Sequence, residues 1–218
     1  MYNTLRLTPF ALIFFLNSCS PILLGVPTVV DEKLERYVTE VGLEIVAVSE
    51  HRDRRANYQF RLADFARRDI LGLSIGKQRI FISYELSRLA YQNRDYRWLL
   101  RHTLAHEIAH DVLGKGPATR EEAGDHKIGL ANRITGGDLG LSSRIKFLPY
   151  SRTAELAADR RAMEYWHKLG WDCRHWVRLF MDFTEQGYEG DVDHPTKERL
   201  EQSMQICSEV SMASAAAY

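Results

Sequence analysis

The stretch His106-Glu107-Ile108-Ala109-His110 constrains this chain more than any other feature of its sequence. It lies within residues 96–113, where apolar side chains recur at the spacing of an amphipathic helix. Residues four apart share one face of a helix, about 6 Å apart along its axis. His106 and His110 can therefore bind one metal ion from the same side, and Glu107 can act as a general base beside it. A motif with only three fixed residues also occurs by chance in unrelated sequences. Other residues of the chain are therefore needed to support a metal site.

The N-terminus predicts export from the cytoplasm. Residues 1–18 carry one basic side chain, then a short apolar run and small polar residues, which is the layout of a secretory signal. Leu16-Asn17-Ser18-Cys19 resembles a bacterial lipobox, in which Cys19 becomes the lipid-bearing first residue of the mature protein. Ser20, in place of Asp, favours the outer membrane. The alternative is an uncleaved membrane anchor that continues through residues 21–24.

The remaining length suits one domain with a real hydrophobic core. We expect a signal peptide over residues 1–18, a lipid-anchored linker over 19–30, the domain over 31–210 and a flexible tail over 211–218. Acidic and basic side chains balance at 29 each. This balance gives no electrostatic footprint for nucleic acid, so we expect no nucleic-acid partner.

Periodicity along the domain predicts an α+β fold that is predominantly helical. Strands are expected over residues 43–48, 58–62 and 79–83. They should form a small sheet beside the helix that carries His106 and His110, which is the expected active-site helix. These strands either bind an extended peptide or form only a structural wall. Residues 117–149 are either a mobile flap or a plain surface loop. Helices are expected over residues 31–41, 84–92, 96–113, 151–168, 172–186 and 195–208.

A catalytic zinc site uses three protein ligands and an open position, so a third ligand has to follow the two histidines. His126 has suitable chemistry but lies in an irregular segment. Glu155 lies in the helix predicted over residues 151–168, and Asp159 follows it by four residues on the same face. This pair fits a zinc ligand and a carboxylate that fixes the tautomer of a ligating imidazole. The alternative is an ordinary charged helix face.

Three segments follow one another in an order that resembles the gluzincin peptidases. They are His106–His110, Tyr150-Ser151-Arg152-Thr153-Ala154-Glu155-Leu156-Ala157-Ala158-Asp159 and His194-Pro195-Thr196-Lys197-Glu198-Arg199. More narrowly, they resemble the family that contains the CAAX prenyl endopeptidases and the bacterial HtpX and BepA proteins. No later apolar run of membrane-spanning length follows, which points to a soluble lipoprotein branch of that family.

The resemblance implies a zincin-like domain with one Zn²⁺ per chain, bound by His106, His110 and Glu155. It also implies that Glu107 is the general base, that Asp159 orients a ligand, and that His194 stabilises the oxyanion. Arg199 either shares in this chemistry or pairs with an acidic neighbour.

The implied protein is a zinc metalloendopeptidase at the periplasmic face of a bacterial membrane, with the outer membrane favoured. Its expected substrates are unfolded or misassembled envelope proteins, and its membrane contact is the lipid anchor. One alternative is a non-catalytic zinc-binding lipoprotein that binds unfolded clients, although an intact Glu107 argues against it. A zinc hydrolase that acts on another kind of bond is the second alternative.

Export would place Cys173 and Cys207 in an oxidising compartment, where cysteines form disulfides more readily than in the cytoplasm. The two residues lie near the start of one predicted helix and near the end of the next. Those ends are neighbours when the helices pack antiparallel. We expect either a disulfide that closes this hairpin or two free buried thiols.

Overall fold

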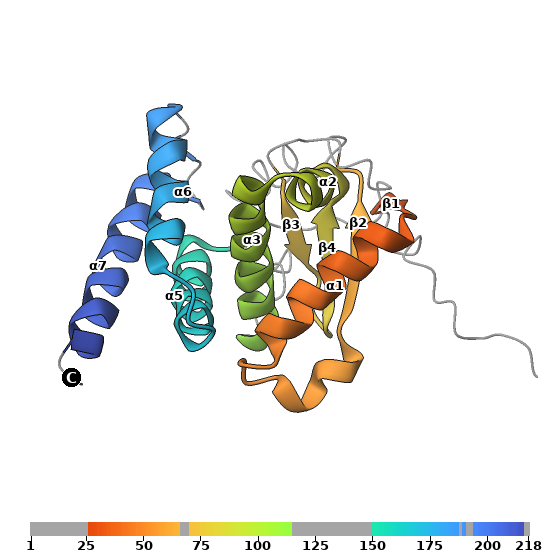
Figure 1. Cartoon of the computed structure of the whole chain (residues 1–218), viewed down its shortest axis with the longest axis horizontal. Coiled ribbons are helices and arrows are strands. Elements are labelled where there is room, and N and C mark those ends of the chain that lie inside the picture. Colours follow the sequence, from red (N-terminus) through yellow and green to blue (C-terminus); the bar gives the residue numbers. More distant parts are fainter. Residues whose placement is uncertain (1–25, 66–69, 115–149, 188, 191–193, 216–218) are drawn as a thin grey trace, which may run out of the picture.

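The computed structural model describes residues 26–65, 70–114, 150–187, 189–190 and 194–215. Helix α3 (Arg94–Val112) runs between two parts of the fold, with the sheet, α1 and α2 on one side and α5, α6 and α7 on the other (Figure 1). The architecture is a mostly helical α+β fold with a small sheet beside α3, as the sequence predicted. The other elements are β1 (Thr28–Val29), α1 (Glu32–Val46), the 3-10 helix η2 (Arg52–Asn57), β2 (Gln59–Ala63), β3 (Gly72–Ser74), β4 (Arg79–Ser83), α2 (Tyr84–Gln92), α5 (Arg152–Lys168), α6 (Cys173–Glu185) and α7 (Thr196–Ala215).

The sheet has the strand order β1-β2-β4-β3, with β2 and β4 parallel at its centre. β1 and β3 pair antiparallel at the two edges, and β3 is the strand that packs on α3. Neither edge strand was predicted, because β1 lies in the expected linker and β3 in a glycine-rich stretch that reads as a turn. Strands of two and three residues are too short to show an alternating pattern.

The strand predicted over residues 43–48 is wrong, because α1 continues to Val46. Asp31 caps this helix by accepting a hydrogen bond from the Leu34 amide at 3.1 Å. The buried residues Leu34, Val38, Gly42, Ile45 and Val46 follow helical spacing and face the core. Tertiary burial along this stripe overrides the local preference of β-branched residues for strands.

Close packing fixes α1 against the sheet at one glycine. A Cβ placed on Gly42 would lie only 2.4 Å from the Phe60 ring of β2. Glycine at this position therefore lets the helix approach the strand directly.

Helices α6 and α7 form the hairpin that the cysteine spacing suggested. The structure joins Cys173 and Cys207 by a disulfide, with 5.6 Å between their Cα atoms. Helix α7 runs to Ala215, past the predicted end at residue 208, so residues 211–215 of the expected tail are helical.

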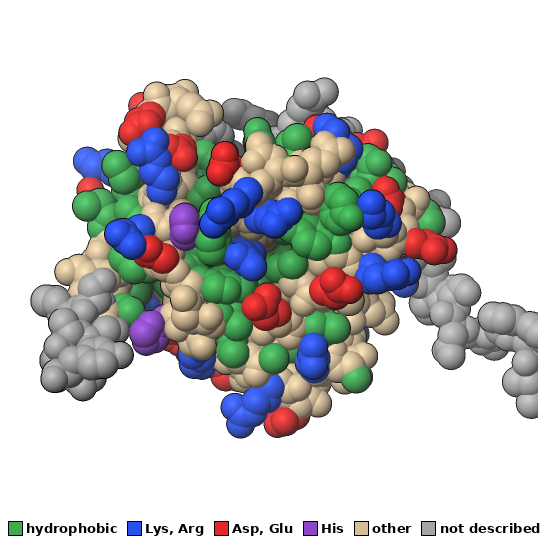
Figure 2. All heavy atoms as spheres, viewed as in Figure 1, with side chains coloured by type: hydrophobic (Ala, Val, Ile, Leu, Met, Phe, Trp, Pro, Cys, Tyr) green, Lys and Arg blue, Asp and Glu red, His purple; other side chains and the backbone are tan. Residues whose placement is uncertain are grey.

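Several predictions lie outside the described residues: the signal peptide, the lipidation site Cys19, the segment 117–149 and the alternative ligand His126. Among the helices that the structure describes, none combines the length and apolar character needed to cross a membrane. On the face seen in Figure 2, acidic and basic side chains both appear, with hydrophobic surface between them.

Candidate metal centre

Helix α3 presents the two histidines of the motif on one buried face. Asn93 caps the helix by accepting a hydrogen bond from the Asp95 amide at 3.0 Å. His106 and His110 follow three to four turns later, both buried, and their Nε2 atoms lie 3.1 Å apart. The i, i+4 spacing thus brings the two nitrogens together, as the sequence predicted.

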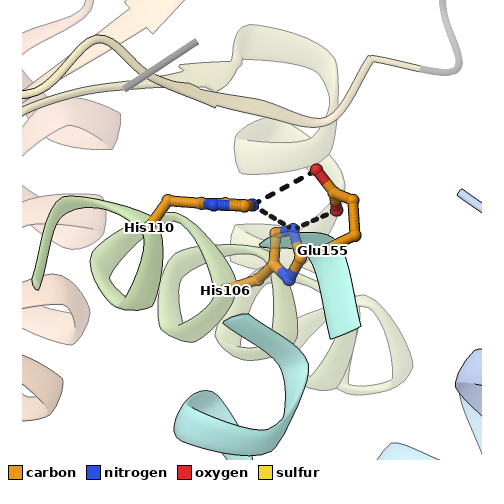
Figure 3. Close-up of side chains that lie close together, drawn as sticks. All are labelled: His106, His110 and Glu155. Carbon is orange, nitrogen blue, oxygen red and sulfur yellow. Dashed lines mark hydrogen bonds and ion pairs between the residues drawn. The ribbon is translucent and has the colours of Figure 1, made fainter. Parts of the chain in front are cut away.

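Glu155 reaches the same point from helix α5. Ser151 caps this helix by accepting a hydrogen bond from the Ala154 amide, and Glu155 lies in the first turn. Its Oε2 is 3.0 Å from His106 Nε2 and its Oε1 is 3.3 Å from His110 Nε2. Figure 3 shows the three side chains pointing toward one another. The carboxylate is fully buried.

These atoms have the arrangement that a metal ion requires. Neither oxygen of Glu155 accepts a well-aligned hydrogen bond from the described residues, although both are buried. Ligands at about 2.0–2.1 Å from a tetrahedral metal lie about 3.3 Å from one another, close to the observed spacings. Two imidazoles and one carboxylate also form a common ligand set for divalent cations. The group His106–His110–Glu155 can therefore hold a metal ion.

A second carboxylate fixes the ring of His106. Asp159, one turn after Glu155 on α5, lies with Oδ1 2.8 Å from His106 Nδ1. Arg199 of α7 donates to the same carboxylate, through Nε at 2.5 Å and Nη2 at 2.7 Å. Asp159 is thus the acidic neighbour of Arg199. Because Nδ1 faces this carboxylate, Nε2 is the nitrogen of His106 that is left for a metal.

Burial and neighbouring charges shift the pKa values of all three residues in the group. Burial by itself would lower the pKa of His106, but the carboxylates of Glu155 and Asp159 outweigh it and raise that pKa to about 9. Burial and the neighbouring His106 lower the pKa of His110 to about 4. Burial opposes ionisation of Glu155, yet the two histidines hold its pKa well below the ordinary value. A metal ion entering the site would therefore displace a proton from His106.

Glu107 follows His106 directly on α3, and its side chain lies against β3 of the sheet. Its side chain is buried, and its Oε2 accepts a hydrogen bond from the Ser74 amide of β3 at 2.7 Å. Burial raises the pKa of Glu107 to about 7. A Cβ on Gly72 would lie 2.9 Å from Glu107 Cγ, so glycine at this position leaves room for the carboxylate. A carboxyl group with a pKa near neutrality can both take and give a proton.

His194 approaches the group from the start of α7. Its Nε2 lies 3.3 Å from Glu155 Oε1, and its side chain is about one-third exposed. Gly190 adopts φ +79°, and a Cβ there would lie 1.9 Å from the His194 carbonyl oxygen. The turn that brings His194 to the site therefore depends on glycine.

Tyr150 has a role that its place in the sequence motif did not reveal. Its ring stacks on His110, with 3.6 Å between the ring centroids. Its hydroxyl donates to the Ser74 carbonyl at 2.9 Å. Tyr150 therefore connects a candidate metal ligand to the edge strand that contacts Glu107.

His102 shares the helix face but does not join the ligand group. Its ring lies parallel to that of His106, with 6.3 Å between centroids, and packs on Trp176 at 4.2 Å. Burial lowers the pKa of His102 to about 3, so it is neutral at physiological pH. His102 belongs to the aromatic packing between α3 and α6.

Comparison with models of known protein families and with curated proteins finds no match for this chain.

Proposed function

We propose that this chain is a zinc-dependent endopeptidase with a zincin-like domain, related to the gluzincins of the CAAX prenyl endopeptidase, HtpX and BepA family. One observation carries the proposal. His106, His110 and Glu155 converge in a buried group with metal-ligand spacing, and Glu107 stands beside them with a pKa near 7.

The choice of zinc follows from the donor set. Two imidazole nitrogens and one carboxylate are the protein ligands of a well-known class of catalytic zinc site. When bound there, zinc supplies Lewis-acid polarisation of a carbonyl group and lowers the pKa of water. His106 and His110 would bind through Nε2 and Glu155 through its carboxylate, while Asp159 holds the ring of His106 in place.

Glu107 acts as the general base in this proposal. The Ser74 amide fixes Oε2, so we assign Oε1 as the oxygen that takes a proton from the attacking water. Glu107 then gives this proton to the leaving amine, which is the second half of the same acid–base cycle. Burial supports both roles, because it brings the pKa of Glu107 to about 7.

His194 is assigned to the developing oxyanion. Its side chain is partly exposed and lies 3.3 Å from the Glu155 carboxylate. Its imidazole can therefore face both the site and an incoming substrate. A donor aimed at an oxyanion typically contributes about 3–4 kcal/mol to the stabilisation of the transition state.

The substrates and location are proposed from the sequence. The signal-like N-terminus and the lipobox ending in Cys19 support an exported lipoprotein that faces the periplasm, with the outer membrane favoured. Unfolded or misassembled envelope polypeptides are the substrates that fit such a location, so we propose a role in envelope protein quality control.

The rival proposal is a zinc-binding lipoprotein that binds unfolded clients without cleaving them. A structural zinc site has no use for a carboxyl group with a pKa near 7 next to its ligands. Glu107 in its buried position therefore favours catalysis over passive binding.

Cleavage of an unfolded protein tests the proposal. Zinc-loaded protein should degrade casein or a denatured outer-membrane protein, and a chelator should stop the reaction. Glu107→Gln should keep the zinc and the fold but lower turnover by at least about a hundredfold, because it removes the general base. Glu164→Gln, which changes a half-exposed side chain of α5 outside the metal group, is the control and should leave turnover unchanged. Equal turnover in Glu107→Gln and wild type would refute the assignment.

A further inference from the structure

Asp111 follows His110 directly, yet its buried carboxylate takes no part in the metal group. Its Oδ2 accepts a hydrogen bond from the Tyr58 hydroxyl at 2.9 Å, and its Oδ1 accepts one from the Gln78 amide, also at 2.9 Å. His51 Nδ1 lies 3.2 Å from the same Oδ2. The last turn of α3 is thereby joined to the residues that flank η2 on both sides and to the turn between β3 and β4.

The turn that Asp111 contacts has an unusual backbone. Gly76, Lys77 and Gln78 have φ angles of +75°, +54° and +59° in succession. Residues with side chains seldom adopt this left-handed region, and such conformations persist where the surroundings hold them. The Gln78 carbonyl accepts from the Gln59 amide at 2.8 Å, while the Gln78 amide donates to Asp111. Both polar backbone groups of Gln78 are therefore fixed.

The β-hairpin formed by β3, this turn and β4 also contacts Glu107. Strand β3 ends at Ser74, four residues before Gln78, and the Ser74 amide donates to Glu107 Oε2. The Ser74 carbonyl accepts from the Tyr150 hydroxyl. Both polar backbone groups of this edge residue thus point to side chains of the candidate site. A displacement of the β3–β4 hairpin would change the direction of the hydrogen bond that the Ser74 amide donates to Glu107.

We propose that Asp111 is a positioning residue for the general base. It holds the strained turn through the Gln78 amide, and the turn holds β3 so that the Ser74 amide meets Glu107. This inference rests on the proposed function, because it assumes that Glu107 is the base. Asp111 itself is not one of the three candidate metal ligands.

The test combines steady-state kinetics with amide hydrogen exchange in the zinc-loaded full chain. Asp111→Ala removes both acceptor oxygens. We expect kcat to fall about tenfold to a hundredfold at unchanged KM and zinc content, since misplacing a reacting group by about 1 Å has effects of this size. The Ser74 and Gln78 amides should exchange faster. Asp111→Asn keeps an acceptor for the Gln78 amide and should recover most of the loss in both readouts.

Tyr165→Phe is the matched control. It removes a hydrogen bond of the same type, from the Tyr165 hydroxyl to the Glu50 carboxylate at 2.7 Å, without touching the hairpin. Its kcat and its exchange at Ser74 should equal those of wild type. If Asp111→Ala does not fold, Tyr58→Phe takes its place, with a smaller fall in kcat in the same direction.

Two results would overturn the inference. One is unchanged kcat in a variant whose Ser74 amide exchanges faster, and the other is unchanged Ser74 exchange in every variant of Asp111 or Tyr58. If wild-type protein cleaves no substrate, the proposed function fails. The exchange of the Ser74 amide then decides by itself whether Asp111 holds the strand against Glu107.

Discussion

The two sides of α3 differ in how they fix the residues of the candidate site. On the side of α5 and α7, buried charges act directly on the metal-ligand group, with Arg199 paired to Asp159 and Asp159 placed against His106. On the side of the sheet, the neutral Ser74 amide donates a hydrogen bond to the carboxylate of Glu107. We infer that metal binding depends mainly on the side of α5 and α7 and proton transfer mainly on the side of the sheet, with Tyr150 as the contact between them.

The difference also concerns how each carboxylate is kept ionised. Asp159 has a full positive charge beside it, and although burial opposes ionisation, Arg199 holds the pKa of Asp159 well below its ordinary value. Glu107 accepts a hydrogen bond from the neutral Ser74 amide and forms no ion pair with an arginine among the described residues, and burial raises its pKa to about 7. The charged side thus keeps its carboxylate permanently ionised, whereas the neutral side leaves one that can exchange a proton near neutral pH.

The largest effect on stability should come from the disulfide on the helical side. The double variant Cys173→Ser/Cys207→Ser should lower the free energy of unfolding by about 3–4 kcal/mol, because the bond closes a loop with a sequence separation of 34. Urea titration without reductant measures this change, and wild type with reductant is the control. Zinc content should not change, because Arg199 still joins α7 to Asp159. A loss below about 1 kcal/mol would mean that the bond adds little to the hairpin.

A smaller and more local effect is expected at Asp159. Asp159→Asn should weaken zinc binding about tenfold to a hundredfold, because the amide cannot supply the charge that orients and polarises His106. Competition with a chromophoric chelator measures the affinity. Asp172→Asn breaks an exposed Asp–Arg pair with Arg174 and is the matched control, with no expected change.

The same variant sharpens the comparison between the two sides of α3. Exchange of the Ser74 amide should stay at the wild-type rate in Asp159→Asn, whereas it should increase in Asp111→Ala. If Asp159→Asn also accelerates exchange at Ser74, then the two sides are mechanically coupled and the separation proposed above is wrong.

The parts of the site that sequence analysis anticipated are those encoded by local spacing. His106 and His110 are one helical turn apart, as are Glu155 and Asp159, so the helix period alone brings each pair to one face. The spacing of apolar residues likewise predicted most of the helices.

The parts that were missed depend on contacts between distant residues. Ser74 and Glu107 are separated by 33 positions, and Tyr150 and Ser74 by 76. No local pattern marks such pairs, and β3 is too short to show the period of a strand. The prediction for residues 43–48 failed for a related reason. Most of the segment belongs to α1, whose Ile45 and Val46 are buried in a core built from residues outside the segment.

Anomalous X-ray scattering at the zinc edge tests the central claim most directly. Crystals of the zinc-loaded protein should show one peak per chain, within bonding distance of His106 Nε2, His110 Nε2 and the Glu155 carboxylate. The Glu155→Gln variant should show this peak weakened or lost. A wild-type crystal with no peak at this position, or with its zinc bound by other residues, would contradict the account.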